Sequence, residues 1–210
     1  MKAEEVLKQR KVRSDKKREI KPTIPVSLKD CIYRISYITD QPVKDIAEQI
    51  CRSGVVSIKV MDHLSEKFRR NLHLKATYYI GDMSRPSLRR RSTKEQKSRI
   101  TIKFHQTDYE NIKKLAYALD ITPSAATAHL LEATIKEHDF FGKFLKGYLE
   151  RKLDDSRMAE LKKVMKYINS NNPYDGEISW AEFIFYLYDS VKSSTMNVVD
   201  VVNNYLNKQK

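Results

Sequence analysis

The chain has 210 residues, of which 40% are hydrophobic, so it is long enough to bury a core in one or two domains. No window contains the roughly 20 consecutive apolar residues that a membrane-spanning helix needs. The basic N-terminal stretch also lacks the apolar run of a secretory signal peptide. We therefore expect no membrane partner and a location in a reducing cytoplasm.

The net charge of +13 is concentrated in two short stretches. Residues 1–21 hold nine Lys/Arg against four acids, and residues 84–99 hold seven against one, so they contribute +5 and +6. Residues 100–210 are neutral, with fifteen bases against fifteen acids. Concentrated positive charge suits a polyanion such as DNA, with a merely solubilising tail and linker as the alternative.

After the basic tail of residues 1–21, residues 22–54 predict an extended stretch and two helices. The extended stretch covers residues 23–26, although Pro22 and Pro25 each lack a backbone donor and make a short or absent strand the alternative. The next four residues, 27–30, have the pattern of a capping box at a helix start.

Both helices of this segment are predicted by apolar residues at helical spacing. The first ends at a turn over residues 40–42, and the second is expected to end at Gly54. Cys31 and Cys51 lie among these apolar residues, which favours buried, reduced thiols over a disulfide or a metal pair. The spaced residues are Leu28, Ile32, Ile35 and Ile38, then Ile46, Ala47 and Ile50.

Residues 55–83 predict a connector that contains a helix over 55–70 and an extended segment over 72–80. Residues 84–98 follow as a basic linker around a single proline. We expect this linker to track a phosphate backbone or to enter a minor groove, with a passive linker as the alternative.

Residues 99–137 repeat the plan of the first segment more clearly, at an offset of 80 residues that becomes 81 after one inserted residue. Alternating polar and apolar side chains predict a strand with Arg99, Thr101 and Lys103 on its exposed face. An ordinary edge strand with its polar face toward water is the alternative. Residues 107–110 have the pattern of a second capping box.

Two helices are predicted after this strand as well. Thr122 is a suitable N-cap for the second of them, because proline is tolerated at the first helical position that follows. The apolar residues at helical spacing are Ile112, Leu115, Ala116 and Leu119, then Ala125, Ala128, Leu131 and Ile135.

A strand, a capped helix, a short turn and a second helix within about 40 residues resemble the ribbon-helix-helix family of the Arc and methionine repressors. The resemblance covers residues 99–136 well and residues 20–54 less well. It implies that two strands pair antiparallel and enter the major groove, with their outward side chains touching base edges. The base contacts implied by position are Arg99, Thr101, Lys103, Lys21 and Thr23.

Phosphate contacts are expected from the start of the second helix in each copy, where free N–H groups can hold an anion, and from the basic linker. Glu19, which aligns with Arg99, is expected to add repulsion near phosphate. The expected phosphate contacts are Thr122, Ser124, Lys44, Arg85, Arg89, Arg90, Arg91, Lys94 and Lys97.

One such unit cannot fold alone, because a lone strand leaves its backbone groups unpaired. The two copies either pair with each other in a pseudo-dimer, or like copies pair between two chains. The roughly 45 residues between Gly54 and Arg99 could reach on the order of 150 Å when extended, so both arrangements stay open.

Residues 138–210 predict a helical domain rich in aromatic residues, which is interpreted as core with a possible interface for oligomerisation. Residues 171–183 resemble part of a calcium-binding loop, but Asn171 and Pro173 replace two of its oxygen ligands. The histidines have no partner at metal-ligand spacing and no glycine-rich phosphate loop is present, so we expect no metal, no cofactor and no catalysis.

The sequence therefore predicts a mainly α fold with a short antiparallel β-ribbon, in which tandem ribbon-helix-helix modules precede a C-terminal helical domain. We expect a sequence-specific double-stranded DNA-binding protein, either a transcriptional repressor or a plasmid partition or relaxosome accessory factor. Its expected place is the bacterial cytoplasm, on the nucleoid or a plasmid. The alternative is an adaptor whose basic segments bind RNA or an acidic partner.

Overall fold

The computed structural model describes residues 17–90, 95–137, 140–142, 144, 154–174, 179, 182 and 183. As predicted, most of the described elements are helices and the strands are short and antiparallel. The strands are β1 (Arg18–Ile20), β2 (Thr23–Pro25), β3 (Leu72–Leu74), β4 (Thr77–Tyr79), β5 (Lys97–Arg99) and β6 (Ile102–Phe104). The helices are α1 (Val26–Thr39), α2 (Val43–Val56), α3 (Ile58–Ser65), α4 (Gln106–Leu119), α5 (Pro123–Lys136), α7 (Asp155–Asn169) and the 3-10 helix η1 (Leu88–Arg90). None of the helices described is long and apolar enough to cross a membrane.

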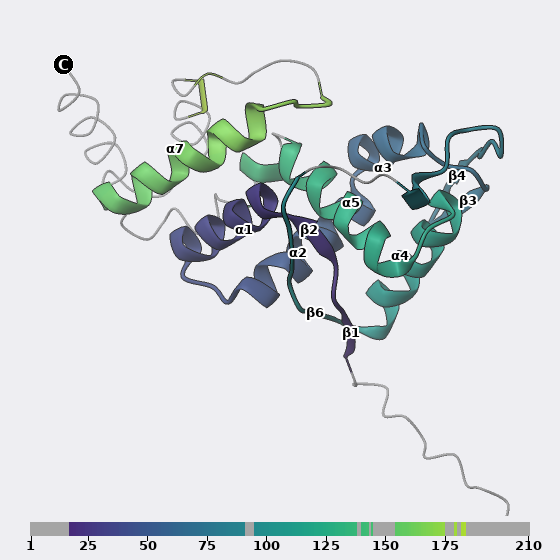
Figure 1. Cartoon of the computed structure of the whole chain (residues 1–210), viewed down its shortest axis with the longest axis horizontal. Coiled ribbons are helices and arrows are strands. Elements are labelled where there is room, and N and C mark those ends of the chain that lie inside the picture. The colour runs from purple at the N-terminus through teal and green to yellow at the C-terminus, as the bar shows by residue number, and fades with distance from the viewer. Residues whose placement is uncertain are drawn as a thin grey trace, which may run out of the picture.

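Two stretches that are far apart in the sequence pair with each other in one antiparallel ribbon, residues 18–25 with residues 97–104 (Figure 1). β1 pairs with β6 and β2 pairs with β5, and a single register runs through both pairs. The strand predicted from residue 99 thus begins two residues earlier, at Lys97. In this structure the partner of each strand comes from the same chain.

Pro22 lies at the interruption between β1 and β2. Its carbonyl accepts a bond from the N–H of Ile100 at 3.3 Å, but proline has no N–H with which to return it. The N–H of Val26 bonds the carbonyl of Gln96 at 3.0 Å. Because bonded and non-bonded pairs alternate, Pro25 falls at a position that needs no ladder bond. Pro22 therefore interrupts the first strand, and neither proline abolishes it.

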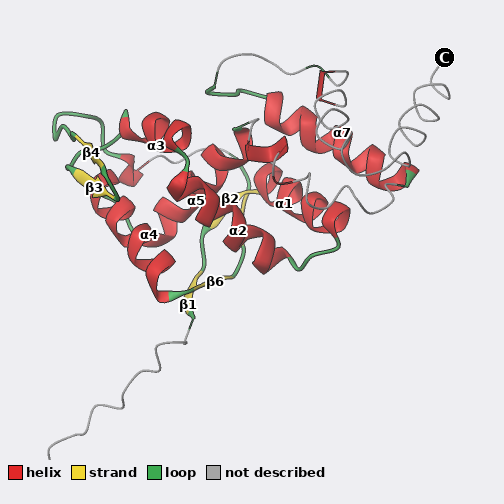
Figure 2. Cartoon of the chain, turned by 180° about the vertical axis from the view of Figure 1, so that it is seen from behind, coloured by secondary structure: helices red, strands yellow, loops and turns green. Residues whose placement is uncertain are grey.

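Side chains along the ribbon alternate between the core and solvent. The inward residues lie over α2 and α5, and these two helices pack against each other at the centre of the molecule (Figure 2). α1 packs on α2, and α4 packs on α5. The buried inward residues are Ile20, Pro22, Ile24, Ile100, Ile102 and Phe104.

The helices after each ribbon strand repeat at a constant offset of 80 residues, α1 with α4 and α2 with α5. The inserted residue predicted for the second copy is therefore wrong. Pro42 is the N-cap of α2, whereas Pro123 is the first residue of α5 and Thr122 is its N-cap. The two prolines therefore do not occupy equivalent positions, although proline is acceptable at both.

Gly54 does not end α2, which continues to Val56. The glycine is buried against α5, and a Cβ at this position would lie 1.9 Å from Oγ1 of Thr134 and 2.9 Å from Cδ1 of Leu130. The residue is glycine because two helices touch there, and not because the backbone must turn.

Neither predicted capping box forms. α1 and α4 each begin two residues earlier than the capping boxes predict, after the N-caps Pro25 and His105, and neither helix has a side-chain cap. At α1, the paired strand supplies part of what a cap would, because a carbonyl of the opposite strand accepts the N–H of Val26. The cap predicted at Thr122 is confirmed, since its hydroxyl accepts the N–H of Ala125 at 3.2 Å.

The connector differs from its prediction. Its helix, α3, is much shorter than the predicted 55–70, because α2 continues to Val56 and Ser57 caps a new helix. The extended segment over 72–80 is a hairpin of β3 and β4 that turns at Lys75 (φ 55°) and packs on α4.

The C-terminal region is described in part. α7 packs across α1 (Figure 1), and its N-cap Asp154 accepts the N–H of Arg157 at 2.7 Å. Most of the remaining helical predictions between residues 138 and 210 lie outside the described residues.

Candidate nucleic-acid interface

The outward side chains of the ribbon form one polar face, which we call the ribbon face. The five residues predicted to contact bases are all exposed on it, and Glu19 and Lys97 complete it. Four cations and one carboxylate thus share a narrow surface with two threonines. The members are Glu19, Lys21, Thr23, Lys97, Arg99, Thr101 and Lys103.

Glu19 is embedded in positive charge. Its carboxylate lies 2.9 Å from Nζ of Lys21, and Lys103 faces it across the ribbon. The hydrogen bond and the charge of Lys21 lower the pKa of Glu19, with a smaller contribution from Lys103. The carboxylate therefore stays ionised, and its neighbours offset the repulsion expected from sequence.

The start of α5 is attached to the middle of the ribbon. Oγ of Ser124 donates a hydrogen bond of 2.8 Å to the carbonyl of Lys21. The first turn of α5 therefore lies beside the ribbon. Thr122 is exposed at this helix start, as is Lys44 at the corresponding start of α2.

Two arginines of the basic linker form hydrogen bonds with other parts of the fold. The guanidinium of Arg85 donates to the carbonyls of Ser65 and Phe68. Arg89 donates to the carbonyl and the carboxylate of Asp120, each at 2.7 Å. Lys97 belongs to β5, whereas Arg91, Lys94 and the side chain of Arg90 lie outside the described residues.

Asp120 is the centre of an arginine cluster that the sequence did not reveal. Its buried carboxylate lies 3.0 Å from Arg69, 2.8 Å from Arg70 and 2.7 Å from Arg89. Arg70 also stacks over the ring of Tyr117, at 4.7 Å from its centroid. Three cations around one anion leave an excess of positive charge two residues before the N-cap of α5.

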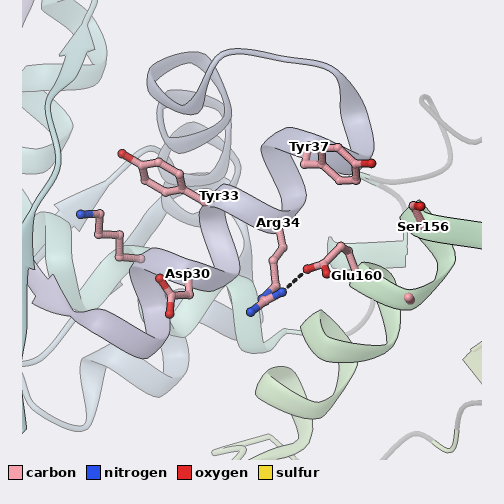
Figure 3. A pocket seen from close by; sticks show the side chains of 8 residues that line it. Asp30, Tyr33, Arg34, Tyr37, Ser156 and Glu160 are labelled. Carbon is pink, nitrogen blue, oxygen red and sulfur yellow. Dashed lines mark hydrogen bonds and ion pairs between the residues drawn. The ribbon is translucent and has the colours of Figure 1, made fainter.

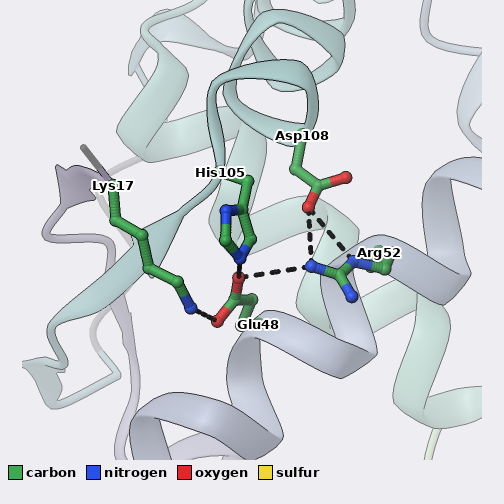
Figure 4. Close-up of polar contacts among 5 residues, drawn as sticks. All are labelled: Lys17, Glu48, Arg52, His105 and Asp108. Carbon is green, nitrogen blue, oxygen red and sulfur yellow. Dashed lines mark hydrogen bonds and ion pairs between the residues drawn. The ribbon is translucent and has the colours of Figure 1, made fainter. Parts of the chain in front are cut away.

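A second polar network lies at one end of the ribbon (Figure 4). The buried carboxylate of Glu48 on α2 lies 2.6 Å from Lys17, 3.4 Å from Arg52 and 3.9 Å from His105. Arg52 also bonds Asp108 in the first turn of α4, at 3.0 Å. These contacts join α2 to the start of β1 and the end of β6, so the network has a positioning role.

A surface groove of about 770 Å³ lies between α1 and α7 (Figure 3). Tyr33 and Tyr37 line it and are half exposed, and Arg34 forms an ion pair with Glu160 across it. Nothing in the groove resembles a catalytic arrangement.

The described residues include no cluster of three or more metal-binding side chains. Cys31 and Cys51 are buried free thiols, as predicted, and burial raises the pKa of both. Comparison with protein-family models, curated proteins and solved structures finds no match to this chain.

Proposed function

We propose that this protein binds double-stranded DNA in a sequence-specific manner, and that its two strand–helix–helix units are ribbon-helix-helix modules paired within one chain. The observation that carries the proposal is the ribbon face. Its cations and threonines are exposed, while every alternate residue from Ile20 to Ile24 and from Ile100 to Phe104 is buried.

The dimensions and chemistry of this face suit a major groove. The groove of B-DNA, about 12 Å wide, admits a two-stranded ribbon. Arg99, Lys21 and Lys103 can donate to guanine N7 and O6, and Thr23 and Thr101 offer a hydroxyl and a methyl group. A ribbon that packs on two helices and is held at one end by ion pairs reaches the groove already ordered.

Phosphate contacts would flank the ribbon. The first turn of α5 lies beside it through Ser124, and a helix N-terminus favours an anion. Such contacts position the protein on the duplex without reading its sequence. We propose the same role for the start of α2 at Lys44.

The role that fits these features is that of a non-enzymatic transcriptional repressor, or of a plasmid partition or relaxosome accessory factor. Further contacts between copies on adjacent DNA sites would come from the C-terminal region. Such a protein would reside on the nucleoid or on a plasmid of a bacterial cell.

The test begins with selection of bound duplexes from a random library, followed by affinity measurements against salt. We expect one preferred site and a log–log salt slope of about −0.9 for each phosphate neutralised. Arg99→Ala and Lys103→Ala should each weaken the selected site by roughly 5- to 150-fold and random duplexes far less, as lost base contacts do.

Lys166→Ala is the matched control, because it removes one exposed charge from α7, well away from the ribbon in Figures 1 and 2. This variant should bind the selected site and random duplexes with nearly unchanged affinity. Equal binding of random duplexes, RNA helices and an acidic polypeptide would contradict the proposal and favour the adaptor, since A-form RNA has a major groove too narrow for side chains to read.

A further inference from the structure

The two halves of the ribbon are related by a pseudo-two-fold axis. The register places Lys21 opposite Thr101, between the pairs Ile20–Ile102 and Thr23–Arg99. Lys21 and Thr101 are also 80 residues apart, which is the offset of the helices. A two-fold rotation about this central pair therefore carries each residue of the first strand onto the residue 80 positions later in the second strand.

The inward face nearly obeys this symmetry. Ile20 corresponds to Ile100, and Ile24 corresponds to Phe104. Apolar residues recur because both strands cover one shared core. The symmetry is therefore retained where packing requires it.

The ribbon face breaks the symmetry at three pairs of related positions, whereas Lys97 corresponds to another lysine, Lys17. At an offset of 80 residues, Glu19 corresponds to Arg99. In the same way, Lys21 corresponds to Thr101, and Thr23 corresponds to Lys103. One end of the face carries Glu19 opposite Lys103, where the charges cancel, and the other carries Thr23 opposite Arg99. The two ends offer different hydrogen-bonding groups to whatever lies against them.

We infer that the DNA site of this protein is not palindromic, and that Glu19 is the residue that most distinguishes its two halves. This inference rests on the proposed function. A carboxylate only accepts hydrogen bonds, and the donors in a major groove are the amino groups of cytosine and adenine. Glu19 accepts from cytosine N4 in one half of the site, and Arg99 donates to guanine in the other.

The ion pair of Glu19 does not prevent this contact. Both partners are exposed, with 44% of the Glu19 side chain and 58% of the Lys21 side chain accessible. An exposed pair of this kind is worth little, so a base edge can replace it. Lys21 and Lys103 then offset the repulsion between the carboxylate and the nearby phosphates.

The first experiment measures the affinity of the full chain for three duplexes. One is the site selected from a random library, and the other two are palindromes, one built from each half of that site. We expect both palindromes to bind at least about tenfold more weakly, because each replaces a matched half by a mismatched one. A palindromic selected site, or equal affinity for all three duplexes, would overturn the inference while leaving the proposed function intact. Failure to select any preferred site would contradict the proposed function itself.

The second experiment repeats the selection with Glu19→Gln. An amide both donates and accepts, so the preference for cytosine should fall by about tenfold at one position and stay unchanged elsewhere. Glu66→Gln is the control, since it removes an exposed negative charge from the end of α3. A uniform gain in affinity for all sequences in both variants, without a change of preference, would show that Glu19 acts only through its charge and would overturn its assigned role.

Discussion

Asp40 and Asp120 hold the same backbone position in two different environments. Each follows the first helix of its unit with a left-handed backbone, at φ 56° and 57°. Aspartate tolerates this conformation better than most residues, which explains its presence at both places. Asp40 is exposed, whereas Asp120 is buried beneath two arginines of the connector and one of the basic linker.

We predict that Asp120→Asn lowers the free energy of unfolding by about 2 kcal/mol, because it removes the anion that compensates three clustered cations. Asparagine keeps the left-handed backbone, so the change isolates the charge. Asp40→Asn is the matched control and should cost less than about 0.5 kcal/mol. Urea denaturation of both variants measures the difference, and equal losses would show that the cluster does not stabilise the fold.

The sequence predicted the exposure of Arg99, Thr101 and Lys103 because a strand has a period of two residues. It could not predict the partners of Asp120. The three arginines lie between 31 and 51 residues away from it in the sequence, and only the folding of the connector over α4 brings them together.

Among the elements, the crossing of α2 and α5 shows how the two units differ to fit each other. Gly54 and Thr134 are 80 residues apart and therefore equivalent, yet they touch. Two threonines would collide at this crossing, and two glycines would leave a gap. The complementary sizes favour pairing of the first unit with the second over pairing of like units.

We predict that Gly54→Ala destabilises the protein by about 1 to 3 kcal/mol, since the added methyl group overlaps Oγ1 of Thr134. In a chain of this size each kcal/mol lowers the melting temperature by roughly 2 to 4 °C. Thermal unfolding followed by circular dichroism measures the effect.

Thr134→Ala in the Gly54→Ala background should restore part of the loss, because it removes the nearest atom. The same substitution in the natural background should destabilise by leaving a void. Purely additive losses in the double variant would mean that the two residues do not compete for space.

Helical periodicity predicted four of these helices because their apolar stripes face a common core. The short sequence patterns that were expected to mark helix ends failed. The capping-box patterns at residues 27–30 and 107–110 do not cap, and Gly54 does not end its helix. A paired strand at the start of α1 and a tertiary contact at Gly54 decide the local structure, and neither is visible in a short window.

At the scale of the whole molecule, the ribbon is built from strands of one chain. Thr23 and Arg99 face each other in it, at a pair without mutual backbone bonds. Such pairs bring Cα atoms within about 5 Å, close enough for a disulfide.

We predict that the variant Thr23→Cys with Arg99→Cys forms a disulfide within one chain on mild oxidation. A non-reducing gel should show a faster monomer band and no dimer. Cys31 and Cys51 do not interfere, because both are buried and burial raises the pKa of each thiol. A covalent dimer as the main product would show that the ribbon is formed between chains.

Residues 57–96 join the first strand–helix–helix unit covalently to the second, and each unit contributes one strand stretch to the ribbon. A tether of this kind supplies a local concentration in the millimolar range, whatever the amount of protein in the cell. Dilution cannot separate the halves, unlike two strands contributed by separate polypeptides. Occupancy of a DNA site would consequently rise in proportion to the concentration of the protein. It would not need the minimum concentration that a protein must reach when it has to dimerise before binding.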